Sequence, residues 1–283
     1  MTGVVVPAAR RSVSAETRVA AVHPTPRPRR RSGARGRKAV LGAVGVAAML
    51  AAWEAIGRNG WFGSTWPPLS TVLETLASEQ RRPVLQRALG ATVGAAGRGF
   101  VLGSVLATAS AAVGFLVPVL RTGIDRLAAV LHALPIIALA PLFIVTVGRT
   151  GTPVAISTLA TFFTMFVATT SAFHAVGAGH ADLFTVGRAT RWQRLVHLEL
   201  PAALPGVADG LRMAAPAAVL GAVLGEWFGA PRGIGLLIVS AMQNYQIPLL
   251  WSAALMGAVL SMVAYGVLSL LARAAATRFG ERS

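Results

Sequence analysis

The side chains that could do chemistry are few, and they form no catalytic or metal-binding pattern. The chain has no cysteine, which excludes disulfides, thiolate metal sites and cysteine nucleophiles. Its only lysine, Lys38, follows Arg37, so no Gly-Lys-Ser/Thr phosphate-binding loop exists. Neither a Ser/His/Asp set nor paired carboxylates occur, and metal-ligand spacing is lacking among His23, His132, His174, His180 and His197. We therefore predict a protein that is not an enzyme and has no catalytic residue, metal or cofactor.

Two ionisable residues, Arg98 and Glu226, lie within or beside apolar runs, where a charge is costly and usually has a role. Arg98 could attract an anionic substrate or extend its side chain to the membrane interface, and both interpretations stay open. For Glu226 we expect a structural role, in which the carboxylate accepts backbone N–H groups of the Gly-rich loop that follows. Pro135 and Pro141 lie in another apolar run and indicate a bent helix, either lining a pathway or simply packing against neighbours.

The composition indicates an integral membrane protein. Of the 283 residues, 54% are hydrophobic and only 13% are charged, whereas soluble domains carry about 25% charged residues. The mean hydropathy is +0.64. A chain of this size has too few charges to cover a water-exposed surface, so its helices must face lipid.

Runs of apolar sequence predict an all-α membrane fold with about six transmembrane helices, because a bilayer core needs roughly 20 helical residues. The expected spans lie within 39–56, 88–120, 127–148, 150–181, 213–225 and 249–271, the fifth being weak. The organisation that follows is a basic disordered cytoplasmic tail (1–38), a first transmembrane helix (39–57), an outer loop (58–87), a membrane-spanning core (88–272) and a cytoplasmic C-terminus (273–283). The outer loop is expected to contain a short amphipathic helix with Ser70 as its N-cap.

The basic residues predict the orientation. With the tail in the cytoplasm, 19 basic residues lie on the cytoplasmic side and six on the opposite side, as the positive-inside rule requires. Both termini are therefore expected in the cytoplasm. The tail holds ten of the 26 basic residues, a pattern that on a soluble protein would suggest nucleic acid. In a membrane protein it indicates anchoring, and no nucleic-acid partner is expected.

The loop at 174–205 carries the most specific pattern. Thr190 and Gln193 have the spacing of a capping box, which predicts a helix that begins at Arg191. Pro201 is expected to mark the end of this helix. An earlier short helix, capped by Asp182, should join it near Gly187. Basic residues recur every three positions and indicate either anchoring or contact with an acidic partner surface: Arg188, Arg191 and Arg194.

This loop resembles the cytoplasmic signature of the transmembrane subunits of binding-protein-dependent ABC importers. That signature reads Glu-Ala-Ala, three residues, Gly, nine residues, Ile-x-Leu-Pro. Aligned on Leu200-Pro201, the Ile position holds Leu198, the Glu position Asp182 and the Gly position Arg188, with Gly187 one residue early. Other segments look like the nitrate, sulfonate and taurine branch of this family, namely 134–143, 190–193, 200–206 and 225–235. Together they cover about residues 88–272.

The resemblance implies a type I ABC importer permease fold in the bacterial cytoplasmic membrane. It implies a pathway for a small solute, either an anion such as a sulfonate, nitrate or taurine, or a pyrimidine (a thiamine precursor) or other heterocycle. A secondary transporter is the alternative from another class, and it would need an intramembrane carboxylate for ion coupling. The implied partners are ABC ATPase subunits, an extracytoplasmic solute-binding protein, a second permease copy forming a homodimer, and membrane lipid. The residues implied to couple to the ATPase are Asp182, Gly187, Arg188, Arg191, Trp192, Leu198, Leu200 and Pro201.

Overall fold

The computed structural model describes residues 33–174 and 190–279. The chain divides into two compact units, Met1–Ala48 and Met49–Ser283. The helix α1 (Gly33–Arg58) begins in the first unit and ends in the second. The second unit is the larger and contains the helix bundle.

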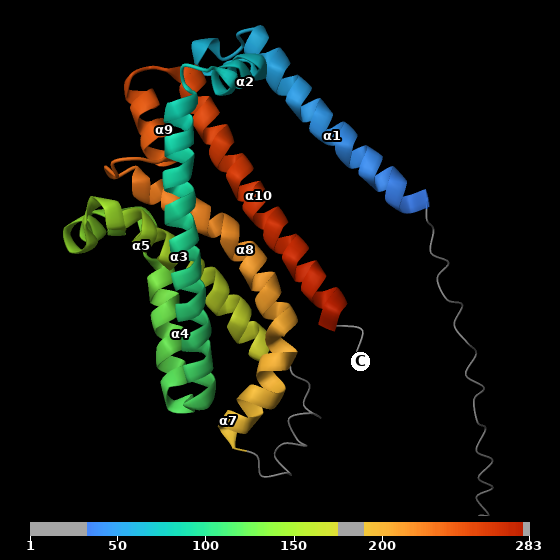
Figure 1. Cartoon of the computed structure of the whole chain (residues 1–283), viewed down its shortest axis with the longest axis vertical. Helices are drawn as coiled ribbons and strands as arrows, with labels where there is room; N and C mark the ends of the chain where they lie inside the picture. Colours follow the sequence, from blue (N-terminus) through green and yellow to red (C-terminus); the bar gives the residue numbers. More distant parts are fainter. Residues whose placement is uncertain (1–32, 175–189, 280–283) are drawn as a thin grey trace, which may run out of the picture. The chain divides into compact units, whose positions relative to one another are not determined.

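The described residues are helical, with short turns and no strand (Figure 1). After α1 the elements are η1 (Gly63–Thr65), α2 (Leu69–Ala77), α3 (Arg82–Leu116), α4 (Pro118–Ala133), α5 (Ile136–His174), α7 (Arg191–Arg194), η2 (Leu195–Glu199), α8 (Leu200–Glu226), α9 (Ile234–Gln243) and α10 (Ile247–Phe279). Five helical segments are long and apolar enough to cross a membrane: Val40–Arg58, Arg82–Leu116, Ile136–Phe173, Arg191–Glu226 and Ile247–Ala274.

The core of the second unit is the packing of α8 against α5 and α3. Glycines on α8 allow the α5 backbone to come close, since a Cβ added at Gly225 would lie 2.6 Å from the Pro153 Cα. A Cβ at Gly210 would lie 2.6 Å from the Ala168 Cβ. Ser157 on α5 also donates its hydroxyl to the carbonyl of Ala218 at 2.9 Å. Small residues that let backbones approach are the usual means of joining helices in a membrane.

The backbone of α5 is interrupted at Gly148, and the part of α5 that follows this glycine runs in the same direction as α3. Gly99 of α3 faces Ser157 of α5, and further along both helices the rings of Phe115 and Phe173 lie 6.1 Å apart. The chain therefore has to return along the bundle between these two helices. It does so through α4 and the part of α5 before Gly148, two helical segments separated by a break in the helix.

The prediction of one continuous span over 127–148 is wrong, because the helix is interrupted within this range. The backbone leaves the helix at Leu134 (φ −71°, ψ 129°), because the following Pro135 disfavours helical geometry in the residue before it. It leaves the helix again at Gly148 (φ 77°, ψ 168°), a conformation that glycine adopts at little cost. The expected second span is likewise too long: α3 ends at Leu116, before Pro118 starts α4.

Two further predictions need correction. Helix α2 begins at Leu69 with Pro68 as its N-cap, so Ser70 lies in the first turn and is not the cap. The expected fifth span over 213–225 is only part of α8, which begins at Leu200. Before residue 213, α8 carries a partly exposed ion pair, in which Arg212 and Asp209 lie 2.7 Å apart.

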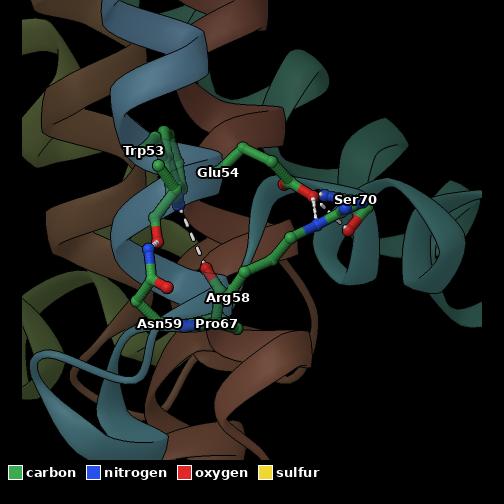
Figure 2. A network of polar contacts seen from close by, with 7 residues as sticks. Trp53, Glu54, Arg58, Asn59, Pro67 and Ser70 are labelled. Atoms are coloured by element: carbon green, nitrogen blue, oxygen red, sulfur yellow. Dashed lines mark hydrogen bonds and ion pairs between the residues drawn. The ribbon is translucent and has the colours of Figure 1, made fainter.

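The end of α1 is bound to the turn before α2 and to its first residues (Figure 2). The Glu54 carboxylate accepts the backbone N–H of Ser70 at 2.9 Å and its hydroxyl at 2.8 Å. Arg58 lies 2.6 Å from the same carboxylate, and the indole of Trp53 donates to the carbonyl of Pro67 at 3.1 Å. Ser70 therefore serves to hold α1 rather than to start α2.

Candidate functional site

The short helix α7 lies at one end of the unit, and α2 and α9 lie at the other (Figure 1). Its N-terminus carries the predicted capping box. The Thr190 hydroxyl accepts the N–H of Gln193 at 3.2 Å, and the Gln193 side chain accepts the N–H of Thr190 at 2.8 Å. The expected helix start at Arg191 is confirmed. Trp192 is 63% exposed, a large fraction for a tryptophan with no partner inside the described chain.

The expected end of this helix at Pro201 is wrong. The chain continues through η2, a π-helical turn in which Leu200 donates its N–H to the carbonyl of Leu195. It then enters α8, so that residues Arg191–Glu226 form one helical rod of 36 residues. Pro201 directly follows the π turn, and its missing N–H removes one bond from the helix without ending it. Proline here redirects the helix without ending it.

The remaining residues of the predicted coupling set divide into two groups. Arg191 and Leu200 are exposed, and Leu198 is partly buried in η2. Asp182, Gly187 and Arg188 lie outside the described residues. Leu195, which the sequence did not single out, is 3% exposed and anchors the start of the rod among core residues such as Met165 and Phe173.

A hollow of about 820 Å³ lies between α3, the end of α4 and α5. Arg98 is the one charged residue that lines it, and its Nε donates to the carbonyl of Gly94 at 3.0 Å. The hollow is otherwise largely apolar, with hydroxyls from three residues and two aromatic rings: Ser110, Thr150, Thr158, Phe143 and Phe162.

The structure does not gather the predicted pathway residues around one site. Of the four, only Arg98 lines the hollow. Pro135 marks the break between α4 and α5, and Pro141 lies within the first part of α5. Glu226 lies at the far end of α8, outside the hollow.

Glu226 is 1% exposed and is the centre of a buried network. Its carboxylate accepts the N–H of Gly235 at 2.8 Å, which is the kind of contact with the Gly-rich loop expected from the sequence. It also accepts the hydroxyl of Thr92 on α3 at 2.8 Å. Gly233 lies so close that an added Cβ would collide with this carboxylate. Thr92 was missed by sequence reasoning, because one threonine in an apolar helix carries no signal of its partner.

Among the described residues, the side chains that could do chemistry are not gathered into one cluster. Within residues 33–174 and 190–279, no group of three or more His, Asp or Glu side chains could hold a metal ion. What the arrangement offers is a lined hollow beside the helix bundle and an exposed capped helix rigidly continuous with α8.

Comparison with known proteins agrees with this description. The fold is similar to that of the MetNI methionine ABC transporter in an inward-facing conformation, with a TM-score of 0.60 and 18% identity over 70% of this chain and 98% of that chain. The architecture is thus that of a type I ABC importer permease. That likeness concerns the fold alone.

Relatives with transport names share part of the chain. The formylaminopyrimidine transport permease protein ThiX of Halalkalibacterium halodurans is 36% identical over 118 residues, 41% of this chain and 47% of that protein. The riboflavin transport system permease protein RibX of Chloroflexus aurantiacus is 32% identical over 143 residues, 50% and 53% respectively. Over these matches the chain spans about half the length of each relative. The putative aliphatic sulfonates transport permease protein SsuC of Bacillus subtilis is 28% identical over 241 residues, 80% and 83%.

The family described as "Binding-protein-dependent transport system inner membrane component" matches residues 88–280, which begin within α3 and include all of α10. This region includes Thr92, Arg98, α7 and the Glu226 network. It covers more than half of the chain, and the chain belongs to this family of integral membrane transport components.

Proposed function

We propose that this chain is the permease subunit of an ATP-binding-cassette importer in the bacterial cytoplasmic membrane. It forms the pathway for a small solute that an external binding protein delivers. Two ATPase subunits bind at the α7 end, a second copy of the chain completes the pathway, and both termini lie in the cytoplasm. The family supports the ATPase and binding-protein partners, and the 19-to-six distribution of basic residues supports the orientation.

The observation that carries the proposal is the continuity of the rod Arg191–Glu226. Its tip is capped and presents the exposed Trp192, while Leu195 just behind it is buried in the core. A partner that displaces the tip must also displace α8, because no flexible linker separates the two. Since α8 packs on α5 and α3, a push at α7 moves the helices that border the hollow.

The hollow supports a small anion as the solute. Among the described residues that line it, Arg98 is the one that carries a charge, and none is an Asp or Glu. Arg98 is exposed, so its guanidinium can pair with an anionic solute that enters the hollow. The absence of an acidic lining residue also disfavours the secondary transporter, which would need a carboxylate where its ion binds.

A planar heterocycle is the second candidate, and a specific observation favours it. The rings of Phe143 and Phe162 also line the hollow and offer faces on which a flat solute could stack. The relatives named for formylaminopyrimidine and riboflavin are consistent with such a solute.

Uptake by the reconstituted complex tests the proposal. The chain is placed in proteoliposomes with its ATPase and binding protein, and uptake of a sulfonate, nitrate, a formylaminopyrimidine and riboflavin is compared. We expect uptake by the assembled complex to require ATP. We expect the purified chain alone not to hydrolyse ATP. Uptake driven by a proton or sodium gradient without ATP would overturn the proposal.

Variants of Arg98 separate the two solute classes. Arg98→Gln should reduce anion uptake strongly while Arg98→Lys retains part of it, and Arg82→Gln at the start of α3 serves as the control outside the hollow. Unchanged uptake in Arg98→Gln would favour the heterocycle.

A further inference from the structure

The helix α8 carries a buried carboxylate at each end. Glu226 at its C-terminus is bonded to Thr92 of α3. Glu199, the residue directly before its N-terminus, is equally buried at 1% exposed. Nothing in the signature Ile-x-Leu-Pro singles out Glu199, since it occupies the unspecified position.

Glu199 is paired with Arg194 of α7. The Arg194 Nε lies 2.9 Å from Oε1 of Glu199, in a pair whose arginine is 35% exposed and whose carboxylate is 1% exposed. The guanidinium carbon also lies 5.7 Å from the ring centroid of Phe115, near the end of α3. Phe115 in turn packs against Phe173 of α5. One arginine side chain therefore connects α7 to α8 and to the ends of two bundle helices.

The π-helical turn η2 explains how this pair forms. In a regular α-helix, side chains five residues apart point about 140° away from each other, because each residue turns the helix by about 100°. The wider π turn, with its i to i+5 hydrogen bonds, brings residues 194 and 199 to the same side. The irregular turn that accommodates Pro201 thus also creates the ion pair.

Because the Glu199 carboxylate is buried, the loss of its partner Arg194 would cost much free energy. A buried carboxylate that loses its cation is strongly unfavourable, whereas an exposed pair contributes little. The second oxygen of Glu199 is buried and has no hydrogen-bond partner among the described residues, so Arg194 is the main compensation for this charge. Removing Arg194 would force Glu199 out of its position and loosen the start of α8.

From this geometry we infer that Arg194 and Glu199, with Phe115, form a clamp that holds α7 in a fixed relation to α8 and α3. The inference rests on the proposed function, in which an ATPase acts on α7. Because of the clamp, α8 and α3 move when α7 moves. Arg194 and Glu199 are therefore positioning residues for the coupling of ATP hydrolysis to transport. Without the clamp, the ATPase still binds and hydrolyses ATP, but its movement is absorbed at η2.

The test measures solute uptake and ATP hydrolysis together in the reconstituted full complex. For Glu199→Gln and Arg194→Met, we expect ATP hydrolysis close to wild type and a loss of about tenfold in solute transported per ATP, within the range by which single residues change coupling. Arg194→Lys should retain part of the coupling, because it keeps the charge without the planar contact to Phe115.

Two variants are matched controls. Arg126→Met removes an exposed arginine on α4, outside the predicted coupling set, and Asp209→Asn breaks the partly exposed pair with Arg212 on α8. Both should transport as many molecules per ATP as the wild type. A similar loss in Arg126→Met would show that the effect does not belong to the Arg194–Glu199 pair and would overturn the clamp.

The ratio of transport to hydrolysis separates coupling from folding. If Glu199→Gln or Arg194→Met only lowers the amount of complex in the membrane, with an unchanged ratio per complex, the pair is merely stabilising and the inference is wrong. Combining Arg194→Met with Glu199→Gln removes both charges; it should restore membrane abundance but not the ratio. Failure of the wild-type complex to link uptake to ATP at all would instead overturn the proposed function.

Discussion

The hydroxyl of Thr92 lies 2.8 Å from the carboxylate of Glu226, although 134 positions separate the two residues in the chain. The same hydroxyl oxygen accepts the N–H of Ile234 at 2.9 Å. Thr92 therefore uses its proton and its lone pair at once, and joins α3 to the end of α8 and the start of α9. At this end of the unit, three helices depend on one buried threonine.

Replacing Thr92 by valine should destabilise the protein by about 1–3 kcal/mol, because the Ile234 N–H loses its acceptor and Glu226 loses a donor while the shape is kept. Thermal unfolding of the detergent-purified chain measures the change. Thr146→Val is the matched control, since Thr146 is exposed and bonds only to the backbone of its own helix. Equal stability of the two variants would contradict the role assigned to Thr92.

Replacing Gly233 by alanine should be more damaging than the loss of Thr92. Gly233 has φ 141°, which L-residues rarely adopt, and the added Cβ would collide with the Glu226 carboxylate. We expect a sharp fall in the yield of folded protein in membranes. Gly123→Ala on α4 is the control, because it lies in a helix with open space around it and should be neutral or slightly stabilising. A normal yield of Gly233→Ala would show that the loop can move away from Glu226.

Enlarging Gly210 should separate α8 from α5. A Cβ at this position already comes within 2.6 Å of the Ala168 Cβ, so the side chain of Gly210→Leu cannot fit without moving the helices. We expect protein that inserts but is degraded or aggregates on extraction, as monitored by size-exclusion chromatography. Gly90→Leu on α3 has no neighbour within 4 Å and should behave as the wild type. A monodisperse Gly210→Leu protein would contradict the close packing of the two helices.

The orientation can be tested by single-cysteine labelling, since the natural chain has no cysteine to remove. Thr190→Cys and Ser283→Cys should react with a membrane-impermeant maleimide only after the cells are opened. Asn244→Cys, which follows α9 at the other end of the unit, should react in intact cells. Labelling of residue 190 from outside would reverse the topology and remove α7 from any contact with a cytoplasmic ATPase.

Contact with the ATPase is best tested at Trp192. Trp192→Ala removes an exposed ring without disturbing the core, so we expect normal membrane levels and at least about tenfold less ATPase copurified, as for a central aromatic contact. Proline at Leu195 would also break the helix, but it is less informative because Leu195 is buried and its loss would damage the core. Trp61→Ala removes an exposed tryptophan at the other end of the unit and is the control. ATPase recovery at wild-type levels in Trp192→Ala would exclude this residue from the interface.

The sequence by itself determined those features that depend on neighbouring residues or on composition. The apolar runs indicated a helical membrane protein, and the capping box of Thr190 and Gln193 placed the start of α7 correctly, because both partners lie within one helical turn. The family motifs around Leu200-Pro201 and Glu226 identified the transport class, which the match over residues 88–280 confirms.

Breaks in the apolar helices and contacts between residues far apart in the chain could be found only in the tertiary structure. Hydropathy could not show that 127–148 is broken at Leu134 and that the backbone turns again at Gly148, since the run is apolar throughout. Pro201 looked like a helix end, and only the π turn before it shows that the helix passes through. The pairing of Thr92 with Glu226 likewise left no trace in the sequence. A hydrogen bond or an ion pair forms where folding brings a donor close to an acceptor. In an apolar chain, the packing of the helices determines which donors and acceptors come into contact.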